Sequence, residues 1–214
     1  MFSEFTFAPQ NNMGEESKIL DRCERLFMRY GIKSVTMDDV SRELGISKKT
    51  LYQYFENKED LVYKVTQNHF ECQNQEVSAI IANSGSAIDE MIGISDWMNK
   101  LSKNMNPGIV FDLRKYHPES WQVFIRHRNE YVFKCIFDNI ERGKREGLYR
   151  EDLNSDIIAR IYISKMEMFF DPEIFPSDKY TPEKTFKEFM NYHIHGIATQ
   201  KGIKYLEKLK TITI

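Results

Sequence analysis

A short segment of the chain, residues 48–55, carries the side chains with the clearest capacity for chemistry: two lysines, a glutamine and several hydroxyl groups. At about 100° per residue in a helix, Lys49 and Gln53 lie opposite Leu51 and Phe55. Lysine donates hydrogen bonds to guanine acceptors, glutamine pairs with adenine, and hydroxyls bind phosphate oxygens. A helix here therefore turns toward solvent a face that suits DNA base edges and phosphates.

Two further helices are predicted directly before this segment. Residues 15–30 repeat apolar side chains at steps of three and four, and Thr36 supplies a hydroxyl cap for the second helix. A glycine turn at Gly45, followed by the cap Ser47, leads into residues 48–55. This order is typical of a helix-turn-helix, whose second helix enters a DNA major groove. On spacing alone, a three-helix bundle with a solvated polar face and no nucleic-acid role is the alternative.

The rest of the chain also shows helical periodicity, without strand alternation. Helices are expected over residues 57–83, 86–104, a short piece ending at Tyr116, 118–147, 154–170 and 182–199, with a tail from Gly202. The sequence therefore predicts an all-α protein.

No residue pattern typical of catalysis or metal binding is found. The GxSxG, HExxH and phosphate-loop patterns are missing from the sequence. His193 and His195 diverge by about 200° on a helix, so they cannot hold one metal ion together. Cys23, Cys72 and Cys135 lie far apart without CxxC spacing. We therefore expect no enzyme activity, no cofactor and no metal site.

Charge is balanced over the chain, with 30 Lys and Arg against 32 Asp and Glu, so attraction to DNA must be local. The basic footprint of the N-terminal part is concentrated near Lys48, Lys49 and Lys58. No apolar run is long enough to span a membrane, and the first basic residue is Lys18, so the positive start of a signal peptide is missing. We expect a cytoplasmic protein without a membrane partner.

Residues 32–40 (IKSVTMDDV) and 44–61 (LGISKKTLYQYFENKEDL) resemble the N-terminal signature of TetR-type (AcrR-like) transcriptional regulators. The resemblance is specific because it joins the helix-turn-helix to the Tyr-x-Tyr-Phe and Asn-Lys-Glu-Asp-Leu elements at fixed offsets. It implies that bases are contacted by Lys48, Lys49, Tyr52 and Gln53, and phosphates by Thr36, Ser47, Thr50, Tyr54 and Lys58. Residues 1–17 contain no Lys or Arg, which argues against a basic arm in the minor groove.

The same resemblance implies a C-terminal domain with a small-molecule pocket and two long helices, about 155–170 and 182–200, that pair with a second copy. The candidate pocket residues are Trp97, Met98, Phe111, Tyr116, Trp121, Phe124, Tyr131 and Met166. The candidate dimer-interface residues are Ile158, Ile161, Tyr162, Lys165, Phe169, Phe189 and Tyr192. For each of these residues, an ordinary position in the chain's own core is the alternative.

The expected architecture has three parts. Residues 1–14 form a flexible N-terminal segment, 15–60 the helix-turn-helix DNA-binding domain, and 61–214 a helical effector-binding and dimerisation domain that starts with the connecting helix. We expect a homodimeric repressor that is released from a near-palindromic double-stranded DNA operator by a small apolar or amphipathic effector. The alternative is a TetR-like protein that acts as a partner-binding adaptor or as an effector-independent regulator.

Overall fold

The computed structural model describes residues 14–102, 106, 108–171, 173–176 and 178–212. Its first helices are α1 (Glu15–Tyr30), α2 (Met37–Leu44), α3 (Lys48–Tyr54) and α4 (Lys58–Asn83). The later helices are α5 (Ala87–Ser102), α6 (Ile109–Tyr116), α7 (Pro118–His127), α8 (Phe133–Arg145), α9 (Ser155–Ser164), α10 (Pro182–Ile197) and α11 (Gln200–Ile212). Across the described residues the protein is all-helical. The predicted segment 1–14 lies outside them except for its last residue.

The three N-terminal helices begin where their capping side chains predict. Thr36 accepts a hydrogen bond from the backbone N–H of Asp39, whose carboxylate accepts from the N–H of Thr36 in return, so the start of α2 is closed by a capping box. Gly45 ends α2 in the left-handed conformation, with φ 70°. Ser47 then caps α3 by accepting from the N–H of Thr50 at 3.0 Å. These local bonds fix the angle between α2 and α3.

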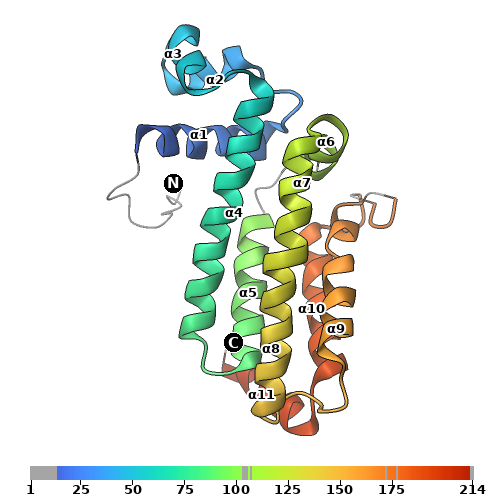
Figure 1. Cartoon of the computed structure of the whole chain (residues 1–214). Helices are drawn as coiled ribbons and strands as arrows, with labels where there is room; N and C mark the ends of the chain where they lie inside the picture. The colour runs from blue at the N-terminus through green and yellow to red at the C-terminus, as the bar shows by residue number, and fades with distance from the viewer. Residues whose placement is uncertain (1–13, 103–105, 107, 172, 177, 213–214) are drawn as a thin grey trace.

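Two cores lie at opposite ends of the molecule. The N-terminal core packs α1, α2 and α3 against the first turns of α4, with Cys23, Leu51, Phe55 and Leu61 almost completely buried. The second core joins α5, α8, α9, α10 and α11. Figure 1 shows α2 and α3 at one end and α11 at the other, with α4 running between them beside the column of α7 and α8. Because α4 packs into the N-terminal core and continues unbroken into the bundle, it belongs to both parts.

Helix α6 ties the two parts together. Ile109 and Leu113 are buried in the N-terminal core, although they lie far along the chain. The backbone N–H of Lys33 donates to Oδ2 of Asp112 at 2.9 Å, which links α6 to the loop between α1 and α2. A displacement of α6 therefore reaches the base of the helix-turn-helix.

Three expectations about the C-terminal helices were wrong. The helix expected over 118–147 is interrupted by a π-helical turn, Arg128–Val132, between α7 and α8. The helix expected over 154–170 ends at Ser164, and the chain tightens into a 3₁₀ turn that brings Phe169 into contact with α10. The tail expected from Gly202 is helix α11, because this glycine lets the helix approach the carbonyl of Leu148, and does not end it.

The far end of the bundle is closed by the buried ring of Tyr149. Its hydroxyl donates to the carbonyl of Ala87 at 3.2 Å, and Nδ2 of Asn139 donates to the same oxygen at 2.9 Å. The ring lies directly over Gly143 of α8, where a Cβ atom would be 2.0 Å from a ring carbon. A Cβ atom at residue 143 would overlap the ring, so Tyr149 occupies this site only because residue 143 is glycine.

Substitution of Gly143 by alanine is expected to destabilise the protein by about 2 kcal/mol or more, because Tyr149 must leave its site. Chemical denaturation followed by circular dichroism measures the change. Gly196→Ala is the matched control, since Gly196 also lies inside a helix but its Cβ would have no other atom within 4 Å. If Gly143→Ala unfolds like Gly196→Ala, the packing over Gly143 does not hold Tyr149.

His193 on α10 is a titratable group buried in the second core. Its ring lies between Tyr162 and Phe189, and its Nε2 atom has no hydrogen-bond partner among the described residues. Burial lowers the pKa of His193 from 6.5 to about 4. The folded protein therefore keeps this imidazole neutral at pH values where the unfolded chain protonates it.

Stability is expected to fall as the pH drops from 6.5 toward 4, because only the unfolded chain binds the proton in this window. The pKa difference corresponds to a loss of about 3 kcal/mol. His193→Leu is expected to remove this part of the pH dependence, whereas His195→Leu, at an exposed neighbouring position, leaves it unchanged. Denaturation curves at pH 7 and pH 4.5 measure both. Equal pH dependence in the two variants would contradict the assignment.

Candidate nucleic-acid interface and central cavity

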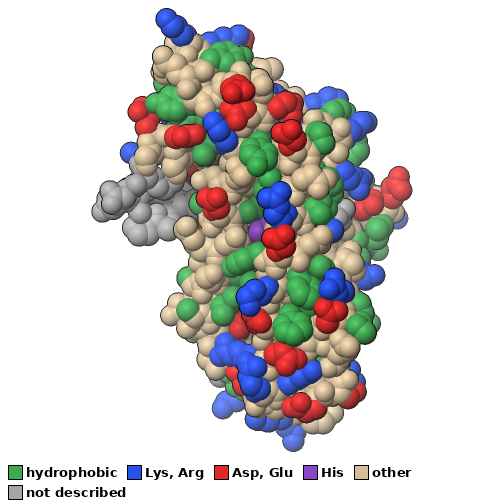
Figure 2. Space-filling view, viewed as in Figure 1, with side chains coloured by type: hydrophobic (Ala, Val, Ile, Leu, Met, Phe, Trp, Pro, Cys, Tyr) green, Lys and Arg blue, Asp and Glu red, His purple; other side chains and the backbone are tan. Residues whose placement is uncertain are grey.

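The outward face of α3 carries the residues predicted to contact bases. Lys48, Lys49, Tyr52 and Gln53 are exposed, and Tyr52 shows 49% of its surface although it is aromatic. Leu51 on the opposite side is fully buried. Figure 2 shows lysine and arginine side chains at this end of the molecule. The short helix thus stands on the N-terminal core with its polar face free to meet another molecule.

Lys48 differs from its neighbours because it forms an ion pair with Asp38 of α2. Both side chains are 54% exposed, and an exposed pair of this kind contributes at most about 1 kcal/mol. Lys49 forms no ion pair with any described residue, and it is exposed on the outward face. A nucleic-acid acceptor would therefore have to displace Asp38 from Lys48, whereas it would meet no such competitor at Lys49.

The residues predicted to contact phosphates have mixed surroundings. Thr36, Ser47 and Thr50 are used in helix caps, and the hydroxyls of Ser47 and Thr50 lie 2.8 Å apart. Burial, and then the nearby carboxylate of Glu15, raise the pKa of Tyr54, which is half-buried. Each of these four hydroxyl-bearing side chains already has a local contact.

Lys58 has a structural partner that the sequence does not reveal. Its Nζ donates to the carbonyl of Ile32 at 2.7 Å and to that of Lys33 at 3.3 Å. Burial lowers the pKa of Lys58. This lysine holds the loop between α1 and α2 against the start of α4, so a phosphate has to compete with two carbonyl groups for it.

A cavity of about 190 Å³ lies between the two cores. Its walls come from α1, α4, α5, α6, α7, α8, α9 and α10, and most of the lining side chains are apolar. Of the eight predicted pocket residues, five line it: Trp97, Met98, Phe124, Tyr131 and Met166. The other three lie elsewhere. Phe111 is on the surface, the hydroxyl of Tyr116 contacts Lys33, and Trp121 packs against the N-terminal core.

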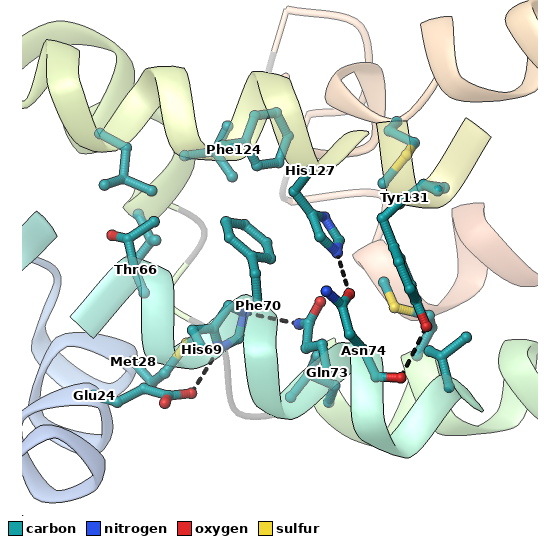
Figure 3. Close-up of a pocket in the computed structure, with 18 of the residues that line it drawn as sticks. Glu24, Met28, Thr66, His69, Phe70, Gln73, Asn74, Phe124, His127 and Tyr131 are labelled. Carbon is teal, nitrogen blue, oxygen red and sulfur yellow. Dashed lines mark hydrogen bonds and ion pairs between the residues drawn. The ribbon is translucent and has the colours of Figure 1, made fainter. Parts of the chain in front are cut away.

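A polar stripe on α4 faces this cavity, and the sequence analysis missed it (Figure 3). Nδ1 of His69 lies 2.7 Å from a carboxylate oxygen of Glu24, and its Nε2 lies 2.7 Å from the amide nitrogen of Gln73. At the next residue, Oδ1 of Asn74 accepts from Nε2 of His127 at 2.8 Å. The sequence pattern that could have revealed these residues is their spacing: they continue the steps of three and four residues that place apolar side chains on the same side of α4.

Aromatic rings stand opposite this stripe. The ring of His127 stacks on Phe70 with centroids 4.2 Å apart, and Tyr131 stacks on its other side at 5.4 Å. Both His127 and Tyr131 lie at the π-helical turn, a type of turn that is frequent at functional sites. Burial, together with the smaller effect of the nearby His69, lowers the pKa of His127 to about 4, so this imidazole is neutral near pH 7.

The residues predicted to form a dimer interface divide into two groups. Tyr162 and Phe169 are buried within the chain, at 4% and 6% exposure, so their assignment to an outer surface was wrong. Ile158 and Phe189 are half-buried against the second core. Ile161, Lys165 and Tyr192 are exposed. Ile157 is also exposed and lies one turn before Ile161 on α9.

Within the described residues, no helix combines the length and apolar character needed to cross a membrane. In the same part of the chain, no group of three or more His, Cys, Asp and Glu side chains is arranged to hold a metal ion.

Known proteins are similar to this chain in sequence and in fold. Residues 19–65 match the family model described as bacterial regulatory proteins, tetR family. A relative from Bacillus subtilis, the uncharacterized HTH-type transcriptional regulator YvaF, is 26% identical over 87% of this chain and 97% of its own length. The HTH-type transcriptional repressor KstR2 of Mycolicibacterium smegmatis is 20% identical over 92% of this chain and 97% of its own.

Solved structures show the same fold. A TetR-family transcriptional regulator from Agrobacterium tumefaciens superimposes with a TM-score of 0.70 at 15% identity, covering 86% of this chain and 98% of that one. The matched model covers α1 to the first turns of α4, where the structure shows the capped helix-turn-helix. Residues 19–65 therefore form a helix-turn-helix of the kind found in bacterial regulatory proteins of the tetR family, and the chain as a whole is similar to transcriptional regulators of this kind.

Proposed function

We propose that this regulator is a homodimeric repressor that binds a near-palindromic operator through two α3 helices and leaves it when a small molecule fills the central cavity. The observation that carries this proposal is the shared wall of the cavity. Phe27 and Met28 of α1 and Ile109 of α6 line it, and these helices also build the N-terminal core on which α3 stands. A molecule in the cavity thus touches the support of the recognition helix.

In this proposal α3 lies in the major groove, with Lys49 and Gln53 at its centre and Lys48 and Tyr52 beside them. Base contacts by these side chains give sequence preference. The caps at Thr36, Ser47 and Thr50, together with Tyr54 and Lys58, are assigned to the phosphates that flank the groove.

Two recognition helices must be held about 34–36 Å apart to meet two half-sites on one face of DNA. The outward faces of α9 and α10 are suited to hold them, because Ile157, Ile161 and Tyr192 are 53%, 50% and 78% exposed. Large apolar side chains so exposed on neighbouring helices are typical of a surface that pairs with another protein. A second copy of this chain would form a four-helix interface there.

In this proposal the dimer leaves the operator because the ligand shifts the equilibrium between two conformations that differ in the separation of their α3 helices. A ligand that binds more tightly to the state with the wider separation of α3 helices weakens operator binding. A difference of a few kcal/mol in ligand affinity is sufficient for such coupling.

Combined substitution of Lys49 and Tyr52 by alanine tests the recognition helix. Each base contact contributes about 1–3 kcal/mol, so the pair is expected to weaken operator binding by at least about 30-fold without changing thermal stability. The operator is selected from random duplexes, and affinity is measured by fluorescence anisotropy at constant salt. Lys204→Ala with Tyr180→Ala is the control, since both residues are exposed and lie outside α3, α9 and α10. Equal affinity of the two double variants would refute the assignment of α3.

Ile161→Glu tests the interface on α9 and α10. A charge buried against a second copy is expected to separate the dimer, and the operator affinity of the resulting monomer falls because only one half-site is held. Molar mass from light scattering after gel filtration measures the assembly. Ile174→Glu replaces an equally exposed isoleucine outside both helices and is expected to stay dimeric. If Ile161→Glu also stays dimeric, the two copies pair through another surface.

A further inference from the structure

The two amide side chains on the cavity-facing side of α4 present an incomplete set of hydrogen bonds. Gln73 uses its Nε2 on His69, and Asn74 uses its Oδ1 on His127. The remaining atoms, the acceptor Oε1 of Gln73 and the donor Nδ2 of Asn74, have no partner among the described residues. Figure 3 shows both amides rising from α4 toward the rings of Phe70 and His127. Both residues line the cavity, so one acceptor and one donor border the same apolar space.

A hydroxyl group complements this pair. It donates one hydrogen bond and accepts others, so it can satisfy Oε1 of Gln73 and Nδ2 of Asn74 at the same time. A carboxylate only accepts, and an ammonium group only donates. Each of these ions would leave one of the two amide atoms without a partner inside the cavity, which costs free energy.

The charges of the lining residues also disfavour ions. No Lys or Arg is found among the described residues that line the cavity, so an anion meets no cationic partner. The one lining carboxylate, Glu24, is already 2.7 Å from the ring of His69. His127 is neutral near pH 7. An ion would lose its hydration without gaining a free counter-charge.

The size and walls of the cavity favour a ring system. An apolar cavity of about 150 Å³ holds benzene. At about 190 Å³ this cavity is somewhat larger, and Phe70, Phe124 and Trp97 supply flat surfaces around it. Aromatic rings pack well against such surfaces in stacked or edge-on arrangements.

We propose that the cavity binds an uncharged molecule of one or two fused rings that carries a hydroxyl group, held between Oε1 of Gln73 and Nδ2 of Asn74. This assignment rests on the proposed function, because it names the chemical class of the effector. It also explains why the polar residues of α4 point inward although the rest of the wall is apolar.

Four probes with the same ring system test the chemical class: naphthalene, 2-naphthol, 2-naphthoate and 2-naphthylmethylammonium. Binding to the full chain without DNA is measured by calorimetry at pH 7. We expect 2-naphthol to bind about five- to tenfold more tightly than naphthalene, because it gains the hydrogen bonds. Both ions are expected to bind at least about 100-fold more weakly than 2-naphthol. If either ion binds as tightly as 2-naphthol, or if no probe binds, the proposal is overturned.

Gln73→Met tests the anchor. It keeps the length of the side chain and removes the acceptor, so the affinity for 2-naphthol is expected to fall to that for naphthalene, with naphthalene itself unchanged. Asn74→Leu removes the donor and is expected to act in the same direction. Gln67→Met is the matched control, since Gln67 lies on the same helix and contacts Tyr63, outside the cavity lining. If the control lowers the affinity for 2-naphthol as much as Gln73→Met, the anchor is wrongly placed.

Release from the operator is measured separately with the same probes. If 2-naphthol binds through Gln73 and Asn74 but leaves the operator complex intact, the ligand class holds and the proposed release does not. If an ion binds most tightly and releases the operator, the proposed release holds and the ligand class is wrong. The two proposals therefore fail in different ways.

Discussion

The burial of Ile109 and Leu113 in the N-terminal core is the contact on which the rest of the molecule depends. It inserts a helix from the second half of the chain into the support of the helix-turn-helix. Close-packed cores transmit displacements, since few voids are available to absorb them. The cavity touches the same helix, so a change in the volume of the cavity reaches α2 and α3 through packed side chains. No lining residue comes from α3 itself among the described residues.

The helix-turn-helix could be predicted from the sequence because its signals are local. A cap such as Thr36 or Ser47 bonds to a backbone group only three residues away, and Gly45 adopts a left-handed conformation that other residues avoid. The inward side of α3 follows from Leu51 and Phe55. The hydrogen bonds of Lys58 could not be predicted, because the carbonyl groups that accept them lie on the loop between α1 and α2, which only tertiary packing brings close to the start of α4.

The cavity and the outer surface were predicted only in part, for two physical reasons. An apolar stripe does not reveal His69, Gln73 or Asn74, because these side chains are polar although they face the cavity, where Gln73 contacts His69 and Asn74 contacts His127. In α9, by contrast, apolar residues cover two sides of one helix. Tyr162 faces the chain's own core and Ile161, one position earlier, faces outward. Periodicity alone shows that both positions are apolar, but it does not show which of them meets its own chain.

The π-helical turn between α7 and α8 has a consequence for how this chain compares with others of similar length. A π turn holds one more residue than an α turn, so it is equivalent to a single inserted amino acid. Deletion of one residue from 128–132 would therefore restore a continuous α-helix and leave the faces of α7 and α8 close to their present orientation, because the wide turn absorbs the extra residue. Phe124 and Cys135, which flank the turn, would keep their places on the cavity wall. Tyr131 lies within the turn, so its place against the ring of His127 depends on the extra residue.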